Sequence, residues 1–165
     1  MKQNQLFMVL CTLFLYAFSP LVATAQNREV RMELTPKSID VDETPIDFYD
    51  DGGPNGQTSP EFQDGKTSSV TFMPKVAGKK VQVDFKLVDI FEGSNYKQFI
   101  RVYDGTEVRA DRLLATINKG TTPIVKATNP QGALTVVFGS TTAIRSNGFK
   151  ALVSLFTPQA MRFRP

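Results

Sequence analysis

Residues 79–90 read KKVQVDFKLVDI, and residues 98–105 read QFIRVYDG. In both stretches apolar side chains alternate with polar ones, which predicts two half-buried β-strands. A polar turn, Gly93-Ser94-Asn95, joins the two strands, and the pair Asp104-Gly105 ends the second. This stretch therefore predicts an all-β protein.

Similar segments follow one another along the rest of the chain, each bounded by turn-forming residues. We predict strands at residues 29–34, 68–73, 81–90, 99–103, 113–117, 124–127, 133–138 and 149–156. Residues 47–56 are dense in turn formers and predict a loop that continues through residues 57–66. One short helical turn is expected within residues 109–115. This series of short strands predicts a β-sandwich or jelly roll.

The alternation also predicts which side chains face the core, because successive side chains of a strand point to opposite faces. We place thirteen side chains between the two sheets: Val81, Val83, Phe85, Leu87, Ile100, Val102, Leu134, Val136, Phe138, Phe149, Ala151, Val153 and Leu155.

The N-terminus has the features of a secretory signal peptide. Lys2 precedes an apolar run at residues 6–18, and Ala23-Thr24-Ala25 forms a cleavage motif, so we expect cleavage between Ala25 and Gln26. The apolar run is too short to span a membrane. We therefore predict a signal peptide at residues 1–25, an N-terminal extension at 26–46, a sandwich domain at 47–156 and a tail or linker at 157–165. No membrane span is expected after cleavage.

The composition narrows the class of protein. The single cysteine, Cys11, lies in the signal segment, and the chain has no histidine. The mature protein therefore lacks disulfides, thiol chemistry, Ser-His-Asp catalysis and histidine-based metal sites. A disulfide-free exported domain favours a bacterial protein of the periplasm or outer surface, or one that is secreted. A net charge of +3 does not favour a nucleic-acid partner.

Motifs along residues 47–156 together resemble a CUB domain. They are the aromatic-acid loop at residues 48–53, Phe72-x-Pro74, Gly78-x-x-Val81-x-Val83-x-Phe85, residues 99–105, Gly132-x-Leu134-Thr135-Val136-x-Phe138-x-Ser140, and Gly148-Phe149-x-Ala151. The chain resembles the cysteine-free form found in exported proteins of Bacteroidetes-type bacteria. This resemblance implies a jelly-roll sandwich of about ten mostly antiparallel strands. It also implies an extracellular, non-catalytic module that binds proteins or glycans.

Many CUB domains of animals bind Ca²⁺ through acidic residues at one end of the sandwich, and this supports capture of a partner's lysine. By resemblance, the corresponding positions here are Asp89, Glu92, Gln98 and Thr141. Two of them, Gln98 and Thr141, lack the family's carboxylate. Since Ca²⁺ needs several oxygen ligands that include carboxylates, we predict no calcium and no other cofactor.

Two groups of polar or aromatic residues leave alternatives open. Phe99, Arg101 and Tyr103 alternate on the outer face of one strand, where they form either an open ligand-binding stripe or a face covered by residues 30–41, which we favour. The group Asp47, Asp50, Asp51 and Asn55 forms either an oxygen cage or, as we favour, a turn whose side chains bond their own backbone.

We therefore predict a non-catalytic adhesion or recognition module for a protein or glycan surface. The alternative is a structural spacer or docking domain of a larger exported protein or enzyme. A carboxylate pair for hydrolysis, Asp84 and Asp89, is disfavoured because nothing in the sequence places the two across a cleft. The oligomeric state and the identity of the ligand stay open.

Overall fold

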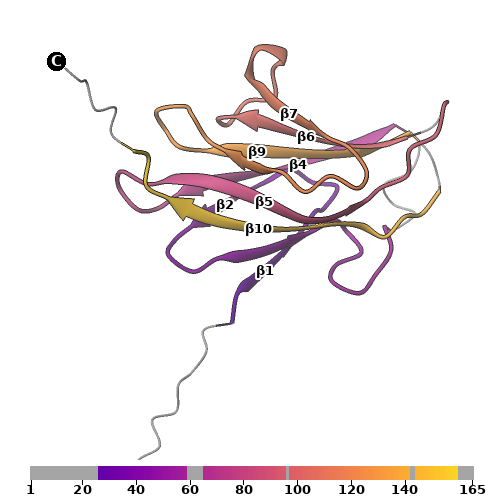
Figure 1. Ribbon diagram of the computed structural model, residues 1–165, viewed down its shortest axis with the longest axis horizontal. Helices are drawn as coiled ribbons and strands as arrows, with labels where there is room; N and C mark the ends of the chain where they lie inside the picture. The colour runs from indigo at the N-terminus through magenta and orange to yellow at the C-terminus, as the bar shows by residue number, and fades with distance from the viewer. Residues whose placement is uncertain (1–25, 59–64, 96, 142–143, 160–165) are drawn as a thin grey trace, which may run out of the picture.

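The computed structural model describes residues 26–58, 65–95, 97–141 and 144–159, which form two packed five-stranded sheets. Sheet A has the order β1 (Arg28–Arg31), β3 (Ile46–Tyr49), β10 (Gly148–Phe156), β5 (Lys80–Asp89) and β8 (Ile124–Lys126). Sheet B has the order β2 (Lys37–Val41), β4 (Lys66–Pro74), β9 (Leu134–Ser140), β6 (Gln98–Asp104) and β7 (Leu113–Ile117). Figure 1 shows the layers, with β6, β7 and β9 above β5 and β10.

Most neighbouring strands are antiparallel, and the two exceptions lie at sheet edges. Strand β1 pairs with β3 in parallel, and β2 pairs with β4 in parallel. The predicted β-sandwich of about ten mostly antiparallel strands is thereby confirmed. A single 3-10 turn, η2 (Ala110–Arg112), falls where a short helical turn was predicted.

The loops gather at the two ends of the sandwich, and strand β6 runs from one end to the other. We call these the Gln98 end and the Asp104 end, after the first and last residues of β6. The Gln98 end carries the connections β1–β2, β3–β4, β5–β6, β7–β8 and β9–β10. The Asp104 end carries the connections β2–β3, β4–β5, β6–β7 and β8–β9; it is the end toward which β10 runs in Figure 1.

The sequence prediction missed two strands. Residues 37–41 form β2, and the expected loop from residue 47 begins instead with β3, which ends at Tyr49. Both strands are short, and β3 leads directly into the Asp-Gly-Gly turn. Their inward side chains are too few to show a clear period of two, so turn composition dominated the prediction.

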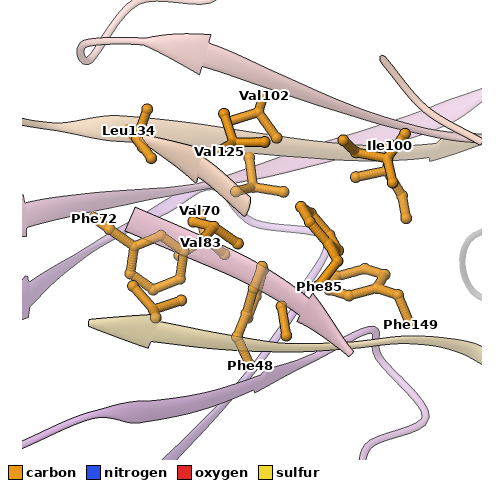
Figure 2. Packing of buried hydrophobic residues seen from close by; sticks show 14 of the residues in the cluster. Phe48, Val70, Phe72, Val83, Phe85, Ile100, Val102, Val125, Leu134 and Phe149 are labelled. Atoms are coloured by element: carbon orange, nitrogen blue, oxygen red, sulfur yellow. The ribbon is translucent and has the colours of Figure 1, made fainter. Parts of the chain in front are cut away.

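Phenylalanine rings are the largest side chains in a core that otherwise consists mainly of valine and other aliphatic residues (Figure 2). Phe149 of β10 makes edge-to-face contacts with three other rings, those of Phe48, Phe85 and Phe138, with centroids 5.1, 6.1 and 5.8 Å away. Phe48 also meets Phe72 across the sandwich at 5.0 Å. Such contacts join the two sheets through one continuous apolar layer.

Of the thirteen predicted core residues, Leu87 alone faces solvent, with 48% of its surface exposed. The cause is a β-bulge: Ala151 pairs with Phe85 and Lys150 with Leu87, so Lys86 has no partner residue on β10. The extra residue reverses the alternation, and Val88 becomes the next buried side chain.

Residues 1–25, with Cys11 and the predicted signal peptide, lie outside the described residues, as do residues 160–165 of the predicted tail. Cleavage between Ala25 and Gln26 and the domain boundaries therefore stay predictions. Within the described ranges, no helix has the length and apolar character needed to cross a membrane.

Candidate functional site

Gln98, the first residue of β6, points inward at its end of the sandwich and is 3% exposed. Its amide oxygen accepts hydrogen bonds from the Phe91 backbone N–H at 2.9 Å and the Ser146 hydroxyl at 2.5 Å. Its amide nitrogen donates to the Thr58 hydroxyl at 3.3 Å and to the Ile144 carbonyl at 3.2 Å. One neutral side chain thus holds three separate loops together.

Two of these loops, β3–β4 with Thr58 and β9–β10 with Ser146, are also hydrogen-bonded to each other. The Thr58 backbone N–H donates to the Ser146 carbonyl at 2.9 Å, and the Ser146 N–H donates to the Thr58 hydroxyl at 3.0 Å. Because a carboxamide both donates and accepts, Gln98 satisfies this buried network without a charge. Its role here is structural.

The other positions of the family's calcium site make separate local contacts. Asp89 pairs with Lys119 at 2.8 Å and accepts a bond from Asn147 at 2.6 Å, and these two partners lower the pKa of Asp89. Glu92 accepts the Lys119 backbone N–H at 2.7 Å, and Thr141 accepts the backbone N–H of Lys97 at 2.9 Å.

Asp89 is the last residue of β5 and Glu92 lies in the loop that follows it, whereas Thr141 comes directly after β9. Over the described ranges, no group of three or more acidic, histidine or cysteine side chains is placed to hold a metal ion. The absence of calcium stays a prediction.

Sequence reasoning missed the contact between Asp50 and Gly148. Asp50 is fully buried; one carboxylate oxygen accepts the Gly52 N–H at 2.8 Å, as expected for a turn that bonds its own backbone, and the other accepts the Phe149 N–H at 2.8 Å. Burial raises the pKa of Asp50 to about 6, with a further rise from Asp51, against the lowering by the two N–H donors.

Gly148 is required for this contact. A Cβ atom at this position would lie 1.8 Å from an Asp50 carboxylate oxygen, and the residue has φ +72°. The sequence contained both parts, the acidic turn and the Gly-Phe pair, but only the β3–β10 pairing shows that they meet.

The expectation that residues 30–41 cover the outer face of β6 is wrong. Strand β1 joins the other sheet, and β2 lies at the far edge of sheet B with β4 and β9 between it and β6. Phe99 and Arg101 are consequently half-buried rather than covered, whereas Tyr103 is 6% exposed. Two of the three predicted ligand-binding residues thus reach the surface.

Phe99 packs on the neighbouring strand β9, where it pairs with Gly139. A Cβ at Gly139 would approach within 2.4 Å of the Phe99 ring, so only glycine leaves room for the ring. The Arg101 guanidinium lies over the same ring, 4.7 Å from its centroid. Phe99 and Arg101 therefore form one stacked pair on the outer face of sheet B.

Beside this pair is a surface hollow of about 430 Å³, which we call the hairpin hollow. It lies where the β5–β6 hairpin meets the end of β7. Its lining combines a ring edge, two cations, a carboxylate, an amide and a hydroxyl: Phe99, Arg101, Lys97, Glu92, Asn118 and Thr116, with Gly93, Gln98 and Ile117. This arrangement offers hydrogen-bond donors and acceptors next to an apolar group, as small-ligand sites do.

At the opposite end, the Asp104 side chain accepts hydrogen bonds from the β8–β9 loop. The donors are the Thr128 N–H at 2.9 Å, the Asn129 N–H at 3.2 Å, the Asn129 amide at 2.6 Å and the Thr128 hydroxyl. Gly105, the next residue, has a positive φ of 106°. Burial acts to raise the pKa of Asp104, but these donors outweigh it and keep the pKa below its usual value.

The carboxylates considered for hydrolysis are engaged elsewhere. Asp84 pairs with Lys86 at 2.5 Å on the outer face of sheet A, and Asp89 pairs with Lys119. A second surface hollow, of about 250 Å³, lies at the Asp104 end beside Glu107 and Arg112. Neither Asp84 nor Asp89 lines this second hollow.

No protein-family model matches the chain, and no curated protein does. Solved structures do resemble it. The CUB1-EGF-CUB2 domains of rat MASP-1 match with a TM-score of 0.51 and 17% identity, over 72% of this chain and 42% of that one. The full extracellular region of zebrafish Gpr126/Adgrg6 matches with a TM-score of 0.53 and 18% identity, over 81% of this chain and 15% of that one.

The chain thus spans less than half the length of each of these two structures. At such low identity the likeness concerns the fold, and it shows that the fold is a CUB-like β-sandwich.

Proposed function

We propose that this chain is an extracellular, non-catalytic recognition module that binds a glycan at the hairpin hollow. The observation that carries the proposal is the half-buried Phe99–Arg101 pair beside a hollow lined with hydrogen-bonding side chains. Sugar hydroxyls require many directed donors and acceptors, which Asn118, Thr116 and Glu92 supply. The signal-peptide pattern at residues 1–25 and the extracellular origin of one structural neighbour support the location.

A bulky substitution that fills the hollow tests the proposal without disturbing the core. Thr116 is exposed on β7 and lines the hollow, so Thr116→Tyr should block it. Thr122, an exposed residue of the β7–β8 loop outside the lining, provides the matched control Thr122→Tyr. On a broad glycan array, the wild type from Gln26 to Pro165 and Thr122→Tyr should bind the same glycan, and Thr116→Tyr should not. Glycan binding that survives Thr116→Tyr would place the site elsewhere.

A spacer or docking domain is the second candidate, supported by apolar residues at one edge. Val108 is 52% exposed, and Leu113 and Leu114 on edge strand β7 are also exposed. A Leu113→Glu/Leu114→Glu variant that changes the state of association in sedimentation, in a chain that binds no glycan, would favour this function.

A further inference from the structure

We infer that the ligand of the hairpin hollow is an acidic glycan, one of whose anionic groups binds between Arg101 and Lys97. This inference rests on the proposed function and adds the chemical class of the ligand. It follows from how four lining residues are held: Phe99, Arg101, Lys97 and Glu92.

Arg101 is held in place by stacking, and no carboxylate of the described ranges forms an ion pair with it. Its guanidinium is stacked over Phe99 at 4.7 Å. Stacking orients the flat group while leaving its N–H edge available. A guanidinium held in this way donates two parallel hydrogen bonds to a carboxylate or sulfate with little loss of conformational freedom.

Phe99 supports Arg101 rather than the ligand. The edge of its ring lies over Gly139, and the guanidinium of Arg101 lies over its face. A neutral sugar that binds through stacking needs an open aromatic face, and this ring is occupied. The affinity should therefore come mainly from charge-assisted hydrogen bonds.

Lys97 adds a second cation to the same hollow. Its backbone is fixed by Thr141, which accepts the Lys97 N–H at 2.9 Å and donates its own N–H to the Lys97 carbonyl at 2.9 Å. The side chain is exposed and, within the part of the chain that the structure describes, forms no ion pair. Its ammonium group can turn toward an anion bound at Arg101.

Glu92 favours a sugar over an acidic peptide. It lies opposite Lys97 in the hairpin, and one of its oxygens accepts the Lys119 N–H at 2.7 Å. Lys119 itself pairs with Asp89, so the hollow keeps one net positive charge from Lys97, Arg101 and Glu92. A peptide with consecutive carboxylates would set one against Glu92, whereas a sugar hydroxyl would donate to it.

Calorimetry with defined oligosaccharides tests the inference. The probes are tetrasaccharides of galacturonate, of alginate and of heparin, neutral galactotetraose, and tetraglutamate. We expect at least one anionic tetrasaccharide to bind and the neutral one not to. Arg101→Gln and Lys97→Gln should each weaken binding by about tenfold or more, since each removes a charge-assisted contact. Lys150→Gln is the matched control, because Lys150 stacks over Tyr49 on the opposite sheet at 5.5 Å.

Each outcome has a distinct meaning. Binding of heparin but not of the uronates keeps the inference and identifies the anionic group as sulfate. Binding of galactotetraose that is insensitive to Arg101→Gln and abolished by Thr116→Tyr overturns the acidic ligand and keeps the proposed function. Tighter binding of tetraglutamate than of any sugar would show that the ligand is an acidic peptide, and it overturns the assignment of a glycan ligand. Failure of every probe overturns both the inference and the proposed function.

Discussion

Strand β6 begins and ends on a buried polar side chain, and the two organise opposite ends of the sandwich by different chemistry. Gln98 is neutral and joins three loops by donating and accepting. Asp104 is a carboxylate that only accepts, and among the described residues the donors named above all lie in the β8–β9 loop. An amide links loops that present both kinds of group, whereas a carboxylate fixes one loop that presents N–H groups.

The ends also differ in how tightly their backbones meet. At the Gln98 end, Gly148 lies against the Asp50 carboxylate, and any Cβ would collide with it. At the Asp104 end, a Cβ at Gly105 would meet only the Asn129 side chain, at 4.0 Å. Both glycines have positive φ, so an alanine at each position compares a strained backbone with and without a collision.

The largest effect is expected from Gly148→Ala. The substitution strains the backbone and displaces Asp50, which leaves the part-buried N–H group of Gly52 and the buried N–H group of Phe149 without an acceptor. Backbone strain of about 1–3 kcal/mol and about 1–3 kcal/mol for each orphaned N–H group together lower the unfolding free energy by about 3–9 kcal/mol. Gly105→Ala should cost about 1–3 kcal/mol, because it carries the backbone strain alone. Urea unfolding measures both, and equal losses would show that the collision relaxes at no cost.

Exchanging the polar group at each end should give the next largest effect. Gln98→Glu replaces the amide nitrogen by an oxygen that faces the Ile144 carbonyl, and it buries an uncompensated charge. We expect a loss of about 3–5 kcal/mol. Asp104→Asn keeps the shape but turns an NH₂ group toward N–H donors, at about 1–3 kcal/mol. If Asp104→Asn proved the more damaging of the two, charge rather than neutrality would be the stricter requirement.

The pH dependence of stability should have opposite signs for two carboxyl groups, Asp50 at the Gln98 end and Asp104 at the other end. The pKa of Asp50 is raised to about 6, so its contribution is present below the unfolded value of 3.8 and is lost as the pH rises through about 6. This loss is at most about 3 kcal/mol. The pKa of Asp104 is lowered, so its contribution is present above the unfolded value and is lost as the pH falls through the folded one.

Urea unfolding across the acidic range separates the two carboxyl groups. Asp50→Asn should remove the decline in stability that occurs as the pH rises from 4 to 7. Asp104→Asn should reduce the decline that occurs as the pH falls into the more acidic range. Each variant is the control for the other. An unchanged slope between pH 4 and pH 7 in Asp50→Asn would assign that titration to another group.

The sequence was sufficient for the parts of the fold that depend on local pattern. The long alternating strands β5, β6, β9 and β10 and all but one of their core residues follow from a period of two. It was insufficient where one residue shifts the register, as Lys86 does in β5. The pairing of Asp50 with Gly148 and of Phe99 with Gly139 joins residues far apart in the chain, and no local pattern encodes it.

For the candidate site, the sequence indicated Phe99 and Arg101 but not what they do together. Alternation placed both on one outer face. It did not show that the ring is occupied by Arg101, nor that Lys97, Thr116 and Asn118 complete a hollow. These features depend on which strands become neighbours. The prediction that residues 30–41 cover the outer face of β6 was wrong for the same reason, because the sequence does not show the strand order.

The smallest effect is expected from calcium, and it tests whether the family's calcium positions at the Gln98 end can hold a cation. Of the four family positions, Gln98 uses its oxygen for Phe91 and Ser146, Asp89 is shared between Lys119 and Asn147, and Thr141 is bonded to Lys97. A hard cation would have to displace these partners and would still find few carboxylates. Millimolar Ca²⁺ should therefore leave the melting temperature of the wild type unchanged, with Mg²⁺ as the control.

The double variant Gln98→Asp/Thr141→Asp supplies the contrast. It adds two carboxylates at the positions where this chain departs from the calcium-binding pattern. It should be less stable than the wild type without calcium, because the Gln98 network is lost, and should recover part of that loss when Ca²⁺ binds the folded state alone. A rise of several degrees in the wild type would mean that Asp89 and Glu92 exchange Lys119 for a cation. In that case Ca²⁺ would bind at the Gln98 end, and the contrast between neutral Gln98 and charged Asp104 would not extend to the residues around them.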